Sequence, residues 1–191
     1  LCKTGSKVSA SDLGFDSKVY TVKLYDINDS GKEFNSSLSY KAEGYSFACK
    51  IYSDKLSITD DGTVTGTDSL KSFTGTLSIP RYLNEIKVTA IDKEAFAAKE
   101  GEKAYSFTKL ILPDTITSIG EKAFMNCTSL KDVTIPSGVS VLSDYIFAGC
   151  KNIQFFASPD GITSIGKNAL SGCSNLVAVN LSKNLKTIGD E

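Results

Sequence analysis

Residues 117 to 185 repeat one pattern of apolar side chains at a constant step of 23 residues. Three complete units follow one another without a gap: 117–139, 140–162 and 163–185, and a further unit opens at Lys186. The cysteines display the step most simply, because Cys127, Cys150 and Cys173 occupy the same place in each unit. A short fixed period is typical of a solenoid, in which every unit packs only against its neighbours. The period therefore argues against one central core for this part of the chain.

The other apolar residues of the units also fall into columns. Four columns besides the cysteines are apolar in every copy: Ile119, Leu142, Ile165 and Ile188; Phe124, Phe147 and Leu170; Leu130, Ile153 and Leu176; Val133, Phe156 and Val179. Stacked units would join each column into a ladder of buried side chains. Because each unit buries these side chains only against the next, an isolated unit should not fold.

Upstream of residue 117 the pattern continues with insertions. Residues 88–96 match residues 116–124 at a step of 28, and the additional residues fall in 97–107. Residues 75–80 match residues 109–113 through a shared Leu-x-Ile/Leu-Pro sequence. We predict about five repeats over residues 70–191, the first irregular, as terminal repeats usually are, and the last truncated.

Each unit has two chemically different halves. The first half contains a Ser-Ile-Gly turn and then a one-turn helical piece, such as Glu121–Met125 or Lys167–Leu170. The second half is extended: in 130–136 the residues at 130, 133 and 135 point inward, Asp132 and Thr134 point outward, and the proline ends the strand. We therefore expect one short parallel strand per unit and a curved sheet whose concave face carries the outward residues.

Residues 1–69 lack the period and form a second region. Alternating patterns predict strands at Val19–Tyr25, Tyr45–Tyr52, Leu56–Ile58 and Thr63–Thr65, the last two flanking an Asp-Asp-Gly turn. The end of this region has a short resemblance to the closing strands of bacterial immunoglobulin-like modules. We expect a small β-rich N-terminal domain, either an immunoglobulin-like sandwich or a cap on the exposed edge of the first repeat.

The composition excludes several classes of partner. Lys and Arg number 21 against 22 Asp and Glu, so the broad positive field that nucleic acid or an anionic membrane requires is missing. No run approaches the roughly 20 apolar residues of a membrane helix, and no signal peptide pattern is present. We expect neither a nucleic acid partner nor a transmembrane segment in these residues.

The five cysteines divide into two groups. Cys127, Cys150 and Cys173 share one column, and we expect them to be buried and reduced, because unpaired cysteine is among the most buried residue types. Cys2 and Cys49 remain. A disulfide between them is compatible with an exported protein, but the sequence does not establish it.

Side chains for catalysis and metal binding are scarce. The chain has no histidine, which removes Ser-His-Asp and Cys-His sites and nearly every catalytic zinc arrangement. The run Asp26–Gly31 imitates the start of a calcium loop, but Ser37 stands where the closing acid belongs, so a polar hairpin turn explains it better. We expect no enzyme activity, no catalytic residue, no metal site and no cofactor.

The columns resemble the BspA-like subfamily of leucine-rich repeats, with the pattern L-x-x-I-x-x-x-A-F-x-x-C-x-x-L-x-x-V-x-I-P-x-x-V, over about residues 75–191. Three places depart from it. Ile146 replaces the small Ala of the A-F pair, Leu170 replaces its Phe, and Phe155 places an aromatic beside Phe156 where an outward polar residue is usual. The resemblance implies a leucine-rich repeat solenoid of parallel strands with short helical or 3-10 segments.

The resemblance also implies a function. Proteins of this family look like adhesins of host-associated bacteria and some mucosal protists. The implied protein is exported and non-enzymatic, lies at the cell surface or outside the cell, and binds a protein or glycoprotein of a host or microbial surface. The near-neutral charge favours short-range shape recognition. The ligand, the source organism and the oligomeric state stay open.

The predicted partner-binding residues lie in two outward columns of the strands. Phe155 is the sharpest candidate, because the period points it outward while Phe156 fills the inward column. Interface energy concentrates at aromatic anchors of this kind. Alternatively, a loop or neighbouring chain covers Phe155, or a bulge exchanges the two rings. The candidate residues are Lys109, Ile111, Asp132, Thr134, Phe155, Ala157 and Asn180.

Two other functions stay open. One is a structural spacer of a longer protein, whose repeats continue beyond Glu191 and whose concave face is inert. The other is a carbohydrate-binding surface protein that uses the tyrosines of the N-terminal region: Tyr20, Tyr25, Tyr40, Tyr45 and Tyr52.

Overall fold

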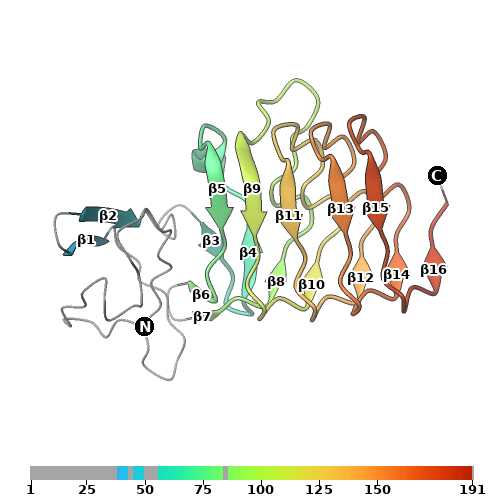
Figure 1. The fold of residues 1–191 in the computed structure, drawn as a ribbon, viewed down its shortest axis with the longest axis horizontal. Helices are drawn as coiled ribbons and strands as arrows, with labels where there is room; N and C mark the ends of the chain where they lie inside the picture. The colour runs from blue at the N-terminus through green and yellow to red at the C-terminus, as the bar shows by residue number, and fades with distance from the viewer. Residues whose placement is uncertain (1–37, 43–44, 50–55, 84–85, 191) are drawn as a thin grey trace.

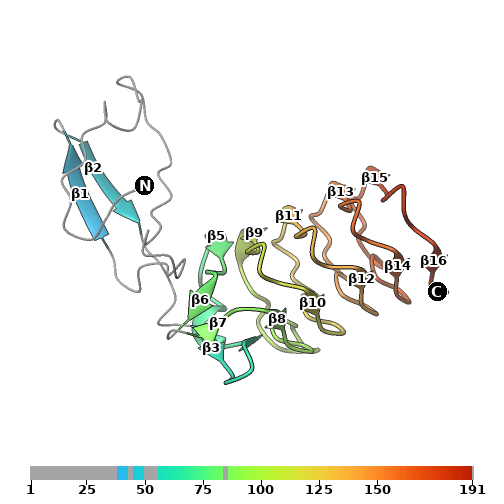
Figure 2. The same cartoon turned by 90° about the horizontal axis from the view of Figure 1, so that it is seen from below.

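The computed structural model describes residues 38–42, 45–49, 56–83 and 86–190. Figure 1 shows the strands from β4 to β16 stacked in two rows, and the turned view in Figure 2 shows the rows as two layers of one solenoid. Each circuit of the chain adds a strand to each row, and we call one circuit a coil. The solenoid predicted from the period is therefore confirmed.

The upper row in Figure 1 is a series of the parallel strands that the sequence predicts. It consists of β5 (Gly75–Ser78), β9 (Phe107–Ile111), β11 (Asp132–Thr134), β13 (Phe155–Ala157) and β15 (Ala178–Asn180). Lys109 pairs with Thr76 on one side and with Asp132 on the other, as the alignment of the irregular repeats requires. We call the outward side of these five strands the strand face.

The lower row is a second series of parallel strands that the sequence analysis did not predict. It consists of β4 (Thr63–Thr65), β8 (Ala90–Ile91), β10 (Ser118–Ile119), β12 (Val141–Leu142), β14 (Ser164–Ile165) and β16 (Thr187–Ile188). The predicted Ser-Ile-Gly turn is wrong, because Ser118 and Ile119 are extended and pair with the equivalent residues of the preceding coil. An outward Ser beside an inward Ile is the alternation of a strand, which two residues are too short to reveal as a period.

The segment that follows each lower strand is a series of turns, and the helical piece predicted there is wrong. We call residues 121–126 and their equivalents in the other coils the turn segment. Within it, the N–H groups of Ala123 and Met125 donate hydrogen bonds to carbonyls of their own coil. The alternate residues donate to the next coil instead, Lys122 to the Asp144 carbonyl and Phe124 to the Ile146 carbonyl. Lys122 has a φ of 57°, and a helix of L-residues does not pass through that left-handed conformation.

Among the described residues the only helix is the 3-10 turn η3 (Asp68–Leu70). It stands before the first regular coil. The expected short 3-10 element therefore exists at one place and is not repeated along the solenoid.

Buried columns form the core. The rings of Phe96, Phe124 and Phe147 stack face to face, with centroids 5.5 Å apart at each step and interplanar angles of 2° and 11°. The three column cysteines are free and buried, as predicted. Each thiol donates to a carbonyl of the preceding coil; for Cys150 the acceptor is the Phe124 oxygen, 3.1 Å from Sγ.

A glycine is required where two coils approach most closely. A Cβ built on Gly120 would lie 2.4 Å from the backbone nitrogen of Lys93 in the preceding coil. Ser143 occupies the same position one coil later. There the Ser143 hydroxyl donates to the Ile119 carbonyl, so the side chain bridges the two coils.

Residues 56–70 contribute to the same core. β3 (Ser57–Ile58) and β4 form an antiparallel hairpin, and β4 pairs in parallel with β8. Leu56, Val64 and Leu70 are buried against the repeats, although the sequence analysis assigns residues up to 69 to a separate region. The division into two domains at residue 70 stays a prediction.

The remaining described strands are two antiparallel hairpins. β6 (Tyr82–Leu83) pairs with β7 (Ile86–Lys87) inside the irregular first coil. β1 (Leu38–Ala42) pairs with β2 (Tyr45–Cys49), which covers the first part of the strand predicted at 45–52. Three features of the sequence analysis lie outside the described residues: the strand predicted at 19–25, the loop at 26–31 and Cys2. The described residues do not distinguish an immunoglobulin-like sandwich from a cap.

Candidate binding surface

The strand face carries the two predicted columns of outward residues. In order along the solenoid the first column is Thr76, Lys109, Asp132, Phe155 and Ala178, and the second is Ser78, Ile111, Thr134, Ala157 and Asn180. All ten are exposed except Ile111, which is half-buried. The seven candidate residues therefore share one face, in the order that the period predicts.

Phe155 is the most exposed aromatic side chain on this face. Its side chain is 66% exposed, whereas Phe156 is 1% exposed and its ring lies 5.8 Å from the Phe147 ring. This arrangement excludes the alternative in which a bulge exchanges the two rings. No part of the chain that the structure describes covers Phe155.

The neighbours of Phe155 on the face are small. Ala178 lies opposite it on β15, and Ala157 follows it on the same side of β13. Val177, directly before Ala178, is 76% exposed. The phenyl ring therefore stands above a low apolar surface, and covering such a ring fully is worth about 1.5 to 3 kcal/mol.

Charged residues flank this apolar area. Lys109 and Asp132 lie side by side on β9 and β11, and neither belongs to any of the ion pairs found among the described residues. Both charges are therefore available to a partner. Apolar side chains with polar ones beside them are common in protein interfaces.

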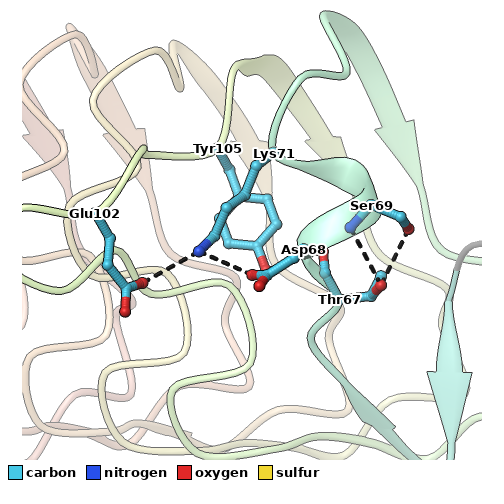
Figure 3. A network of polar contacts seen from close by, with 6 residues as sticks. All are labelled: Thr67, Asp68, Ser69, Lys71, Glu102 and Tyr105. Atoms are coloured by element: carbon cyan, nitrogen blue, oxygen red, sulfur yellow. Dashed lines mark hydrogen bonds and ion pairs between the residues drawn. The ribbon is translucent and has the colours of Figure 1, made fainter.

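A polar cleft of about 450 Å³ lies at the other end of the solenoid, between η3 and the inserted residues of the 28-residue step. Its central side chain is Lys71, whose Nζ lies 2.8 Å from an Asp68 carboxylate oxygen and 3.1 Å from one of Glu102 (Figure 3). Hydrogen bonds from Lys71 to Asp68 and Glu102 raise the pKa of Lys71 to about 12. The ammonium group is thus held between two anions.

Tyr105 lines the buried side of the same cleft. Its side chain is buried, its hydroxyl donates to the Thr67 carbonyl at 3.1 Å, and burial raises its pKa. The sequence analysis did not single out this group of residues. The signal was present in the insertion at 97–107, because additional residues in a regular solenoid must project from it or fold over it.

The described residues offer little reactive chemistry. Burial raises the pKa of the Cys127 and Cys150 thiols, so they are poor nucleophiles. No group of three or more potential ligands that could hold a metal ion occurs in the described ranges. Within those ranges there is also no helix long and apolar enough to cross a membrane.

The fold and its exposed face define the class of protein: a leucine-rich-repeat solenoid that presents a sheet surface to solvent. The family follows from a direct comparison. The model of the BspA type leucine rich repeat region matches residues 89–191, more than half of the chain, as six copies. The chain belongs to this family.

Solved structures of bacterial proteins share the fold. A leucine rich cell surface protein from Faecalibacterium prausnitzii is 23% identical with a TM-score of 0.51, over 71% of this chain and 37% of that one. A leucine-rich repeat protein from Bacteroides ovatus is 26% identical with a TM-score of 0.56, over 72% and 37%. The pneumococcal vaccine antigen PcpA is 18% identical with a TM-score of 0.57, over 83% and 35%.

This chain therefore corresponds to little more than a third of each of those proteins. No curated protein matches it.

Proposed function

We propose that this protein acts outside the cell, at or near a cell surface, and binds another protein or glycoprotein through the strand face. The observation that carries the proposal is Phe155, an aromatic ring 66% exposed on β13, at a position where the other strands of the upper row hold residues such as Lys109, Asp132 and Ala178. A scaffold position that tolerates polar residues does not require a phenyl ring. Burial by a partner gives that ring a function.

The solved relatives support the location. One is described as a cell surface protein and another as a vaccine antigen. The partner-binding set under this proposal is Lys109, Ile111, Asp132, Thr134, Phe155, Ala157 and Asn180. Enzyme activity forms no part of the proposal.

The test measures binding of the purified chain to immobilised collagen, fibronectin, laminin and mucin by biolayer interferometry. Phe155→Asp is the informative variant, since Asp132 shows that the position accepts a carboxylate. We expect binding of at least one probe, weakened by about tenfold or more in the variant, as for an aromatic hot spot. Circular dichroism and melting temperature establish that both chains are equally folded.

Val141→Ser is the matched control. Val141 is also an exposed apolar residue, 46% exposed, but it lies in the lower row, where the equivalent residues are Ser118 and Ser164. Equal binding by wild type and Phe155→Asp would remove the strand face as the site. Failure of both to bind any probe would favour a spacer that presents another domain.

A further inference from the structure

Both rows of strands lose their hydrogen-bonded ladder at the same place. In the upper row β9 pairs with β11 and β13 with β15, but β11 and β13 are not paired; in the lower row β10 and β12 are likewise unpaired. These strands belong to the coils 117–139 and 140–162. We call the boundary between the two coils the seam.

Individual N–H groups show the loss. At regular boundaries the Thr117 N–H donates to the Thr89 carbonyl, and the Lys131 N–H donates to the Thr108 carbonyl. Their equivalents one coil later are Ser140 and Gln154, whose N–H groups have no acceptor among the described residues. Bonds of the same kind reappear beyond the seam at Thr163 and Val177.

The turn segment holds the seam together. Across it the Lys122, Phe124 and Asn126 N–H groups donate to carbonyls of the next coil, with N to O distances of 2.9, 3.0 and 2.7 Å. The stacked pair of Phe124 and Phe147 crosses at the same level. The backbone bonds that remain are therefore concentrated along one edge of the coil, and elsewhere the seam is crossed by side-chain bonds from Ser143, Cys150 and Asn152 to carbonyls of the preceding coil.

Side-chain volume explains the position of the seam. Coil 140–162 has Ile146 where the adjacent coils have Ala123 and Ala169, and Phe156 where the preceding coil has Val133; both larger side chains are fully buried. The column of Phe124, Phe147 and Leu170 decides on which side these side chains find space. In the following coil Leu170 is smaller than a phenylalanine and leaves room. In the preceding coil Phe124 is a full-sized ring and leaves none. Because packed interiors do not compress, the larger side chains would keep β12 and β13 from pairing with β10 and β11.

We infer that the solenoid consists of two stiff halves that bend against each other at the seam, with the turn segment as the hinge. Bending of this kind changes the distance between β11 and β13, and with it the curvature of the strand face directly beside Phe155. The hinge needs no bound partner and stands whether or not the strand face is the binding site. A partner that touched both halves would fix one curvature.

The first measurement is amide hydrogen exchange of the intact wild-type chain, resolved by NMR. The N–H groups of Ser140, Ser143 and Gln154 should exchange faster than their equivalents Thr163, Gly166 and Val177 by on the order of tenfold or more, as for locally opening structure. Equal protection at the seam and at the regular boundaries would overturn the inference.

The second measurement uses variants that restore the usual volumes. The double variant Ile146→Ala with Phe156→Val should slow exchange at the Ser140 and Gln154 N–H groups by about tenfold relative to wild type, as the two coils come together and the ladder forms. The matched control is Leu142→Ala, which removes buried volume from the same coil in a column where the adjacent coils hold Ile119 and Ile165, side chains of the same size. It should not slow exchange at these two groups.

Faster exchange throughout the double variant, with no gain at the seam, would show that the large side chains do not separate the coils. The proposed cause would then be rejected. The wild-type comparison would still decide whether the hydrogen-bonded ladder is open at the seam, as the hinge requires.

Discussion

The two ends of the described solenoid differ in how far their apolar side chains are exposed. At the N-terminal end Leu56, Val64 and Leu70 close the core, and all three are buried. At the C-terminal end Val179 is 41% exposed and Ile188 is 62% exposed, although their equivalents one coil earlier, Phe156 and Ile165, are buried. The covered end is built from residues that do not follow the period.

The comparison separates two kinds of stabilisation. Regular coils are held by ladders and columns, which every additional coil extends. The covered end is held by single contacts that occur once, such as the ion pair of Lys71 with Glu102 and the bond from the Tyr105 hydroxyl to the Thr67 carbonyl. Substitutions in the two regions should therefore differ both in size and in how far their effects spread.

The largest effect is expected in the regular columns. Phe124→Ala removes a fully buried ring from the middle of the stack, and it should lower the free energy of unfolding by about 3 to 5 kcal/mol. Leu170→Ala, in the same column but only partly buried, should cost about half as much or less. Urea denaturation of both variants measures the difference. Equal costs would mean that position along the solenoid does not matter.

A smaller loss is expected at the close approach of two coils. Gly120→Ser places a Cβ against the Lys93 nitrogen, which cannot move without disturbing the lower row. We expect a loss of about 1 to 3 kcal/mol, measured by the same denaturation. The reverse change, Ser143→Gly, removes a hydrogen bond and should cost about 0.5 to 1.5 kcal/mol. An unchanged free energy of unfolding for Gly120→Ser would show that the coils approach no more closely at Gly120 than at Ser143.

Tyr105→Phe tests the covered end. The change removes the hydroxyl that donates to the Thr67 carbonyl and leaves the ring packed against Phe96. We expect a loss of about 0.5 to 1.5 kcal/mol. Faster amide exchange should be confined to residues 67–71 and their neighbours. Loosening that spread to residues 163–185 would contradict the view that single contacts act locally.

The smallest effect concerns the junction between the irregular and the regular coils. Glu121 lies 2.9 Å from both Lys122 and Lys93, and hydrogen bonds from these lysines lower its pKa from 4.5 to about 2. A lowered folded-state pKa stabilises the protein above pH 4.5, and this contribution is lost as the pH falls through about 2. Between pH 4.5 and about 2, the melting temperature of wild type should therefore fall further than that of Glu121→Gln. The difference should be small because the pair is exposed.

The sequence predicted the parts of this fold that depend on volume and period. The columns, the register across the 28-residue step and the opposite orientations of Phe155 and Phe156 follow from the spacing of apolar residues. The lower row was missed because two-residue strands carry no period of their own. The prediction of a helical piece was wrong because Lys122, Tyr145 and Asn168 adopt left-handed backbone conformations. These conformations could not be predicted from the residue types.

The candidate site divides in the same way. Placing seven residues on one face needs only the step of the repeat, so the sequence suffices. The cleft around Lys71 depends on where an insertion folds, and the contact of Lys71 with Glu102 joins residues 31 positions apart that share no pattern. The seam was also invisible, because it arises from competition for space between Ile146, Phe156 and their neighbours.

The constant step of 23 residues makes each coil an exchangeable part. Joining residue 139 directly to residue 163 would remove one coil and bring β11 next to β15, with each column still in line. Such a deletion would discard Phe155 and the seam together. A chain built in this way can gain, lose or replace a recognition residue by recombining whole units, while the scaffold that presents the residue stays the same.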